Sequence, residues 1–444
     1  MNMKAGRRSF FGRSRRGSIY VFVLGASMLV VIVGLGALAV TRLNARVGAQ
    51  ANDAVEAAAL AESAVEYALS RLAGNSSWRT YYVNGVETTP KPMGNGTISF
   101  KLVDEALGMA GGDGSLSNNG FDPARAYGYG RVRGTVRVYS VRLRGATPLD
   151  ALRTTIAASD DYKQETGGTL NTTGGPVSTN GVLTRNGTIN GKAEVWGHTG
   201  LGAVTGGITF TAAKAMPDPA IFDMYKRMAT EIPYTSFSGD KLVGNVLSAA
   251  ANPTGGATNP NGVYYIQAPS SKNFELQIWR IKGTLVIECL DKATVRQLTA
   301  VCWEPHAAGF PILIIKHTTA GTTSDQIMPP PDTINEVTIG ANLNPPGTPY
   351  NGACNSTIGS TETYPSQLKG LIHVIAHLNN PNDSEIKLDK GVRITGTMIA
   401  DLQVWTKDAS LSWDSDLYFN PPVGYSTGPA MIPVANTWQW EVGP

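Results

Sequence analysis

A long run without a single charged side chain, residues 18–41, limits what this chain can fold into more than any other feature. Thirteen of its residues are Ile, Leu, Val or Phe. At 1.5 Å per residue, a helix of this length crosses the ~30 Å hydrocarbon core of a bilayer. Each of those side chains favours insertion by about 0.3–0.6 kcal/mol near the helix centre. The run therefore predicts one membrane-spanning helix.

Basic residues lie mostly on one side of this run. Six of them precede it, and Arg42 and Arg46 follow it. The six are Lys4, Arg7, Arg8, Arg13, Arg15 and Arg16. Because basic residues stay on the cytoplasmic side, the N-terminus is predicted to be cytoplasmic and the rest of the chain exported. The net charge of +3 is concentrated in this leader, so it does not indicate nucleic-acid binding.

A cleavable secretory signal peptide is the alternative interpretation of the N-terminus. Such a peptide has a shorter apolar core and a cleavage site of small residues. Here the apolar run is long, and it continues without a break into a second helical pattern. We therefore prefer a membrane helix that stays in the mature protein.

The second pattern is a line of small apolar residues spaced alternately four and three apart. These are Ala54, Ala58, Ala61, Val65, Ala68 and Leu72. This spacing places them on one helix face, and there is no Pro or Gly between Ala49 and Ala73. Gly74 and Asn75 then supply a stop. The sequence predicts one helix over residues 18–73, roughly 80 Å long at 1.5 Å per residue.

At the N-terminus, basic residues are followed by Gly17 and then by an apolar helix with a small-residue extension. This arrangement resembles that of a type IV prepilin. It is most similar to PilX-type minor pilins and K-type pseudopilins. Arg15, Arg16, Gly17 and Ser18 resemble the site of prepilin peptidase, which implies cleavage after Gly17. The stretch ALAESAVEYALSRL, which ends at Leu72, resembles the alanine-rich segment of that family. Major subunits of the family carry Glu at the fifth mature position, where this chain has Phe22.

Two alternating segments follow the helix. Residues 97–103 and residues 131–144 each alternate apolar with polar side chains and are predicted as half-buried strands of a small antiparallel sheet. The second segment is rich in arginine, namely Arg131, Arg133, Arg137, Arg142 and Arg144. Without an interleaved aromatic platform, these arginines indicate a solvated face and no nucleic-acid partner. Residues 149–158 are predicted to form a short helix that closes this unit.

From about Gly167 onward, very short apolar segments alternate with Asn-Gly and Gly-Gly pairs. The chain has 50 Gly and only 16% charged residues, which is typical of exported β-structure. The predicted fold class is α+β, with a mainly-β domain that forms an irregular β-solenoid or, as the alternative, a β-sandwich. A helix near residues 218–232 is expected to cap one end of the solenoid. The final part, residues 370–425, resembles the last coils of PilX-related surface proteins.

These patterns divide the chain into four predicted parts. They are a basic leader (1–17), a transmembrane and amphipathic helix (18–73), a small α/β pilin-like region (74–160) and a β-rich, β-helix-like domain (161–444).

Candidate catalytic and metal-binding residues are sparse. His373 and His377 are four apart, but their neighbours predict a strand, on which the two side chains would lie about 13 Å apart. Asp414 and Asp416 share a predicted strand face and are a weak candidate for the carboxylate pair of a glycosidase. No phosphate-binding or nucleophile motif is present in the sequence. We therefore predict no enzymatic activity, no cofactor and no metal.

The three cysteines leave one alternative open. Cys289, Cys302 and Cys354 form no metal-binding spacing. Cys289 and Cys302 could lie on neighbouring strands and form a disulfide in an exported domain, or both could be isolated buried thiols.

Three functions are compatible with these observations. The first is a prepilin-like minor subunit of a type IV pilus or type II secretion pseudopilus. Its partners would be other pilin subunits, prepilin peptidase and the lipid of a bacterial inner membrane. The second is a membrane-tethered β-helix enzyme acting on polysaccharide. The third is a binding module for surface glycans with no filament role.

Overall fold

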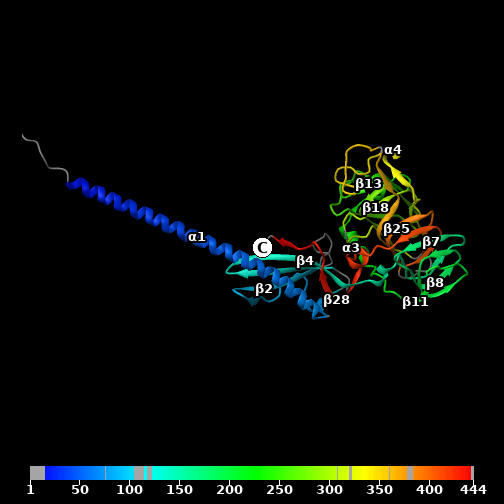
Figure 1. Cartoon of the computed structure of the whole chain (residues 1–444), viewed down its shortest axis with the longest axis horizontal. Helices are drawn as coiled ribbons and strands as arrows, with labels where there is room; N and C mark the ends of the chain where they lie inside the picture. Colours follow the sequence, from blue (N-terminus) through cyan, green and yellow to red (C-terminus); the bar gives the residue numbers. More distant parts are fainter. Residues whose placement is uncertain are drawn as a thin grey trace, which may run out of the picture.

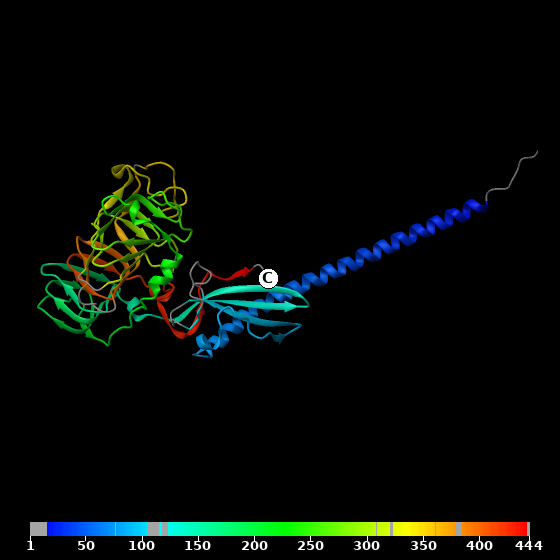
Figure 2. The same ribbon diagram turned by 180° about the vertical axis from the view of Figure 1, so that it is seen from behind.

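The computed structural model describes eight stretches of the chain. These are residues 16–75, 77–104, 115–117, 123–307, 309–319, 323–359, 361–377 and 384–441. A long helix leads into an antiparallel sheet, and a larger β-rich domain lies beyond the sheet at the end opposite the N-terminus (Figures 1 and 2).

The predicted long helix is confirmed. Helix α1 runs unbroken from Arg16 to Ala73, over 58 residues. The glycines at 25, 34, 36 and 48 do not interrupt it, because a single Gly costs a helix only about 1 kcal/mol relative to Ala. The helix ends where Gly74 N–H donates to the carbonyl of Ser70 (3.1 Å).

An antiparallel sheet packs against the second half of α1. Its order is β1-β2-β3-β4-β28, and β29 also pairs with β4. The strands are β1 (Lys91–Met93), β2 (Gly96–Asp104), β3 (Ala124–Val132), β4 (Thr135–Pro148), β28 (Ser426–Pro433) and β29 (Gln439–Glu441). A four-residue helix, α2 (Trp78–Tyr81), connects α1 to this sheet.

The segment predicted as one arginine-rich strand, residues 131–144, is in fact a hairpin. Val132 pairs with Thr135 across a turn formed by Arg133 and Gly134, both at positive φ (49° and 106°). The alternation of apolar and basic residues continues through the turn, so the sequence pattern gave no sign that a turn was there. The other predicted strand, residues 97–103, lies within β2.

The line of small residues on α1 faces this sheet. Ala61, Val65, Ala68 and Leu72 are all 0% exposed. Val65, Ala68 and Leu72 belong to one cluster that also contains Phe100, Leu102, Ala126 and Val141. The residues of the sheet at the point of contact are equally small. A Cβ added at Gly128 or Gly130 would overlap the backbone of α1.

The C-terminal strands return to this first sheet, which the sequence did not indicate. Ser426 of β28 pairs with Pro148 of β4, and Leu149 N–H donates to Tyr425 O (3.2 Å). Residues 149–425 are therefore an insertion that connects β4 to β28, two neighbouring strands of this sheet. The four-part division of the chain remains a prediction, but residues 426–441 belong to the sheet formed by the helix-proximal region.

The β-rich domain contains a 21-stranded sheet in which every pairing described between strands is parallel. The strands are β5 (Ile156–Ala158), β6 (Tyr162–Gln164), β7 (Thr169–Thr173), β8 (Val177–Arg185), β9 (Thr188–Asn190), β10 (Ala193–Thr199), β11 (Ile208–Phe210), β12 (Thr230–Glu231), β13 (Lys241–Ser248), β14 (Val263–Ala268), β15 (Asn273–Lys282), β16 (Thr284–Cys289), β17 (Thr294–Gln297), β18 (Cys302–Glu304), β19 (Leu313–His317), β20 (Thr323–Ile327), β23 (Gln367–Ile375), β24 (Ser384–Leu388), β25 (Val392–Ala400), β26 (Gln403–Thr406) and β27 (Ala409–Ser412). A separate antiparallel pair joins β21 (Thr333–Asn335) to β22 (Thr363–Pro365).

The parallel pairings form three columns. Column 1 runs β11-β10-β8-β5-β25-β23-β19-β16-β14-β12. Column 2 contains β17, β20, β24, β26 and β6 together with the first parts of β13 and β15. Column 3 contains β18, β27, β7 and β9 together with the last parts of β13 and β15 and the first parts of β23 and β25. Long strands such as β25 take part in two columns.

The order of strands in space differs from their order in the chain. The first group, β5 to β7, pairs with the last group, β25 to β27. The chain therefore starts in the middle of the columns, runs to the β11 end, crosses to the β12 end and returns to the middle. The labels β11 and β13 accordingly lie at opposite ends of the domain in Figure 1.

The helix predicted near 218–232 was expected to cap one end of this domain, and that expectation was wrong. Helix α3 (Ile221–Met228) lies against the outer side of column 1. Its Phe222 and Tyr225 are buried in one cluster with Val286 and Ile314 of that column. Column 1 has apolar side chains on both faces, so its outer face needs a cover.

The predicted helix over residues 149–158 was also wrong. A single 3-10 turn (Asp150–Arg153) is followed directly by strand β5. Strand β5 pairs with a neighbour on each side, through Ile156, Ala157 and Ala158, with β25 on one side and β8 on the other. This pairing outweighs the local helix propensity of the two alanines. The other short helical segments are Tyr234–Ser236, α4 (Glu336–Ile339) and α5 (Asp416–Phe419).

The close contact between α1 and β3 leads to a first prediction. Gly130→Ala places a Cβ against the backbone of Ala57 and Ala61, and overpacking of this kind costs about 1–3 kcal/mol. We expect faster amide hydrogen exchange in β3 and in the second half of α1. Gly197→Ala is the control, because the nearest atom to its Cβ would be Val182 Cγ2 at 3.9 Å. Equal exchange in the two variants would contradict the close packing.

A second prediction concerns the ion pair that holds α3 on its column. Lys226 Nζ lies 2.8 Å from Glu288 Oε2, and Tyr265 and Gln267 donate to the same oxygen. Burial raises the pKa of Glu288, but these hydrogen bonds outweigh burial and leave the pKa below its usual value of 4.5. The stabilisation is therefore complete above about pH 4.5 and is lost as pH falls through the folded pKa.

Thermal unfolding as a function of pH measures this effect. Glu288→Gln should lower the unfolding temperature at pH 7 and make it less sensitive to acid, whereas Glu62→Gln, on an exposed part of α1, should leave the profile unchanged. A Glu288→Gln profile that runs parallel to that of the unmodified chain would show that the pair does not contribute.

Candidate functional site: the exposed helix and an adjacent cavity

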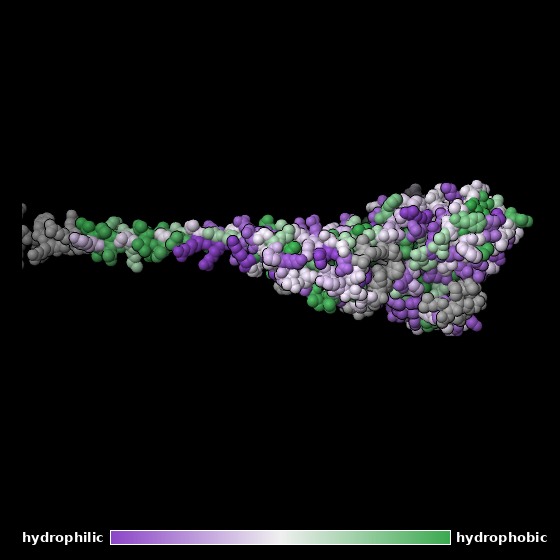
Figure 3. Space-filling model, turned by 90° about the horizontal axis from the view of Figure 1, so that it is seen from below, coloured by the Kyte–Doolittle hydropathy of each residue, from purple (hydrophilic) through white to green (hydrophobic). Residues whose placement is uncertain are grey.

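The N-terminal half of α1 makes no contact with the rest of the described chain. Between Ile19 and Val47 its large apolar side chains are 48–77% exposed. It is the one helix among the described residues that is long and apolar enough to cross a membrane. Figure 3 shows these apolar residues along the thin rod, followed by a hydrophilic stretch before the sheet begins. An apolar surface of this size requires lipid or other helices as its cover.

The predicted processing residues lie at the start of this rod. Gly17 and Ser18 are in the first turn of α1, whereas Arg15 falls outside the described residues. The first turn contains no acidic residue, and Phe22 is 77% exposed. Gly17 therefore lies in the first described turn of α1.

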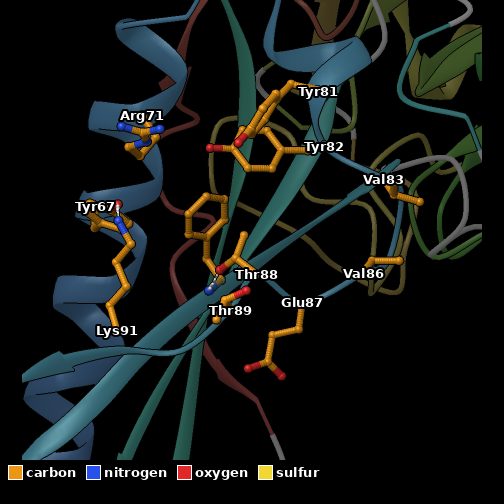
Figure 4. Close-up of a pocket in the computed structure, with 11 residues that line it drawn as sticks. Tyr67, Arg71, Tyr81, Tyr82, Val83, Val86, Glu87, Thr88, Thr89 and Lys91 are labelled. Carbon is orange, nitrogen blue, oxygen red and sulfur yellow. Dashed lines mark hydrogen bonds between the residues drawn. The ribbon is translucent and has the colours of Figure 1, made fainter.

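A cavity of about 390 Å³ opens beside the other end of α1 (Figure 4). The helix, the segment after α2, and strands β1 and β2 supply its walls. The lining residues are Tyr67, Arg71, Tyr81, Tyr82, Val83, Val86, Glu87, Thr88, Thr89, Lys91 and Phe100. Its aromatic residues pack edge-to-face, with 6.0 Å between the Tyr67 and Phe100 centroids and 5.3 Å between those of Tyr82 and Phe100.

Two basic side chains in this cavity are held by phenols. Lys91 Nζ donates to Tyr67 Oη and lies 4.9 Å from the centroid of the same ring. A hydrogen bond with Tyr82 raises the pKa of Arg71 above its usual value. The carboxylate of Glu87 is already bound by Arg131 at 2.8 Å. No salt bridge described in the structure involves Arg71 or Lys91, so the cavity can accept a negatively charged group.

Sequence reasoning missed this cavity. Its one sequence signal is that Tyr67 and Arg71 are four apart on α1 and therefore lie on the same helix face. The other wall depends on the path of residues 81–91 across the sheet, which no local pattern indicated.

Several arginines of the β3–β4 hairpin are used within the protein. Arg131 binds Glu87 and Ser99, Arg133 lies 3.6 Å from Asp53, and Arg144 donates to Phe419 O (3.3 Å). Burial lowers the pKa of Arg144. These contacts hold the hairpin to α1, to neighbouring strands and to the β-rich domain.

The histidine and aspartate candidates do not form a site together. His373 is fully buried, and its Nδ1 lies 2.9 Å from Tyr425 Oη. Asp414 and Asp416 do not share a strand face, because Asp414 precedes a short helix and its carboxylate accepts from the backbone N–H of Asp416 (3.0 Å). Among the described residues, no group of three His, Cys, Asp or Glu could hold a metal ion.

The cysteines are free thiols in the structure. Cys289 lies on column 1, and Cys302 lies in a different cluster on the outer side of column 3. The disulfide left open by the sequence is therefore absent. Burial raises the pKa of both thiols, to about 12 for Cys302, so neither is an activated nucleophile.

Comparisons with known proteins add little. No family model matches the chain, and no curated protein matches it. Among solved structures it is similar to the competence-associated pilin ComZ from Thermus thermophilus, with 11% identity over 88% of this chain and 98% of that chain. The TM-score of 0.24 is too low to carry an argument about fold or activity. Function therefore has to be inferred from the residues of this chain.

The exposed apolar half of α1 leads to a third prediction. The double variant Val30→Arg, Val31→Arg puts two charges at the middle of the apolar run, at a cost of about 2.5–3.5 kcal/mol each. We expect much of this variant to be extracted from membranes by alkaline carbonate. The matched control is Val47→Arg, Val55→Arg, two exposed positions of the same helix beyond that run. Equal retention of both variants would contradict a membrane-spanning role.

Proposed function

We propose that this chain is a prepilin-like minor subunit of a type IV pilus or a type II secretion pseudopilus. One observation carries the proposal: a single 58-residue helix is exposed and apolar in its first half and is covered by an antiparallel sheet in its second. Such a helix is held in lipid before assembly and packs among other helices afterwards. The partners are other pilin subunits.

The surface of the exposed half suits helix packing. Gly25, Gly34, Gly36 and Gly48 have no atom of another element near the position of a Cβ. Small residues of this kind let two helices approach closely, because association within a membrane depends on van der Waals contact between backbones.

The N-terminus is proposed to be processed after Gly17 by a prepilin peptidase. Before processing, the basic leader holds the N-terminus in the cytoplasm, and the folded part lies outside the inner membrane. The new amine of Ser18 would then begin the helix. Phe22 offers no carboxylate to pair with such an amine, which is compatible with a PilX-like or K-type subunit at or near a filament tip.

The β-rich domain is proposed to be a three-sided β-solenoid. Support comes from its three columns of parallel pairings and from the apolar cluster they enclose. A sandwich of two antiparallel sheets does not produce parallel ladders of this kind. The insertion between β4 and β28 attaches the domain at the sheet end far from the membrane segment (Figure 1). The filament would therefore display it outward, for assembly or adhesion.

The mature N-terminus tests this proposal. In cells that contain a prepilin peptidase, N-terminal sequencing of the purified protein should begin at Ser18. Gly17→Leu should abolish this processing, because a bulky residue replaces the one before the cleaved bond. Gly12→Leu, in the same leader, should be processed normally. Recovery of the intact leader, or a start well beyond the apolar run, would refute the pilus role.

A further inference from the structure

Two hollows adjoin at the end of α1 that lies far from the apolar run. One is the cavity of about 390 Å³ beside Tyr67. The other, of about 380 Å³, is lined by Ser70, Arg71, Gly74, Asn75 and Tyr81. Arg71 and Tyr81 line both hollows, so together they form one groove, which we call the Arg71 groove. Each hollow is within the range of about 300–1,000 Å³ that is typical of ligand sites.

The Arg71 groove carries an excess of positive charge. Arg71 and Lys91 are both exposed, and no salt bridge described in the structure involves either of them. The carboxylate among the described lining residues, that of Glu87, is already neutralised. Arg131 Nη1 lies 2.8 Å from its Oε1, and Arg131 Nη2 donates to its Oε2 at 2.9 Å. The groove therefore attracts an anion.

The polar groups that face the groove are mostly hydrogen-bond donors. Tyr67 Oη accepts from Lys91, and Tyr82 is hydrogen-bonded to Arg71, so each phenol keeps its own proton to donate. The ammonium and the guanidinium also keep further N–H groups beyond those that the phenols bind. A ligand that fills this groove must therefore be rich in acceptor oxygens.

The wall across from α1 is apolar. Tyr81, Val83 and Val86 are 67%, 67% and 57% exposed. Figure 4 shows Val83 and Val86 on the far side of the cavity from Tyr67 and Arg71. A ligand that fits both walls has anionic and hydroxyl oxygens along its rim and C–H groups on its faces.

We propose that the Arg71 groove binds an acidic polysaccharide through one of its uronate units. A uronate sugar has a carboxylate for Arg71 and Lys91, hydroxyl oxygens for the phenols, and C–H faces that pack on Tyr81 and Val83. The second hollow, beyond Arg71, has room for the next unit of the polysaccharide. This inference rests on the groove alone and does not depend on the proposed pilus role.

Two other polyanions fit the groove less well. A nucleic acid carries a phosphate at every nucleotide and is bound by a stripe of basic residues, whereas this groove offers two cations. An acidic peptide brings backbone N–H groups that need acceptors, and the nearby carboxylate of Glu87 is already bound by Arg131. Sugar hydroxyls both donate and accept, so their oxygens can face the donors of the groove.

The groove belongs to the unit formed by α1 and the antiparallel sheet. Its walls come from the helix, from the segment after α2 and from the first two strands. No residue of the β-rich domain is among its described lining residues. Retention on an acidic polysaccharide would therefore be a property of the helix-bearing unit, separate from anything that the β-rich domain displays.

The experiment uses the full chain in an uncharged polyoxyethylene detergent, because a maltoside would itself present sugar to the groove. Trigalacturonate is titrated at low salt, and binding is followed by calorimetry. We expect saturable binding with a dissociation constant of about 1 mM or lower, which weakens as NaCl is raised because salt screens exposed charges. Arg71→Gln and Lys91→Gln should each weaken binding about tenfold, through the loss of a hydrogen bond between charged groups. Arg137→Gln is the control, because that exposed arginine lies on β4 outside the groove and its loss should leave binding unchanged.

Further measurements separate a sugar site from general attraction of anions. Neutral maltotriose should bind at least about tenfold more weakly than trigalacturonate, because it has no carboxylate. Tyr81→Ala keeps both cations but removes part of the apolar wall, so it should weaken binding of trigalacturonate while leaving the salt dependence unchanged. Triglutamate and a single-stranded trinucleotide should both bind more weakly than trigalacturonate.

Four results would overturn the proposal. They are no saturation up to about 10 mM trigalacturonate, normal binding by Arg71→Gln or by Tyr81→Ala, equal binding of maltotriose, and equal or tighter binding of triglutamate or the trinucleotide. The last of these would assign the groove to an acidic peptide or to a nucleic acid instead.

Discussion

The contact between the second half of α1 and the antiparallel sheet is the interaction on which the rest of this structure depends. Small residues face each other across it, with Ala61 and Val65 on the helix and Gly128 and Gly130 on β3. Because neither side carries bulk, the two backbones come close, and the helix is held rigidly along its last turns. The first half of the helix then extends from a fixed base with its apolar surface free. Without that base, the exposed half would be an anchor with no defined direction.

The same sheet also carries the β-rich domain. Strands β4 and β28 are neighbours, and residues 149–425 connect them. A domain attached through both of its ends is held at two points, and here Arg144 and Tyr425 add contacts at the junction. Because the chain starts and finishes in the middle of the columns, the two ends of the columns are free of connections to the sheet.

Charge is distributed unevenly over the described residues, and two places differ from the rest. Most basic side chains of the hairpin have an acidic or carbonyl partner close by, as Arg131 and Arg133 show. The cavity beside Tyr67 instead holds Arg71 and Lys91 against neutral phenols. In the loop around Glu336, the buried carboxylate instead accepts from the backbone N–H of Leu343 and from the hydroxyl of Tyr364. Both places lie in the folded part of the chain, away from the apolar rod.

The sequence alone determined the parts that depend on local pattern. Absence of charge over residues 18–41 and the spacing from Ala54 to Leu72 were enough to predict α1, because helix formation and membrane insertion follow from neighbouring residues. Composition also indicated a mainly-β remainder. Only the tertiary structure decided the rest: the hairpin at Arg133, the return of β28 to β4, the position of α3 beside column 1, and the strand at Ile156 where a helix was expected. Each of these is decided by partners from other segments of the chain or by a turn that leaves the apolar pattern unchanged. The cavity and the surroundings of the Glu336 carboxylate were also hidden, since their members meet only when separate segments fold together.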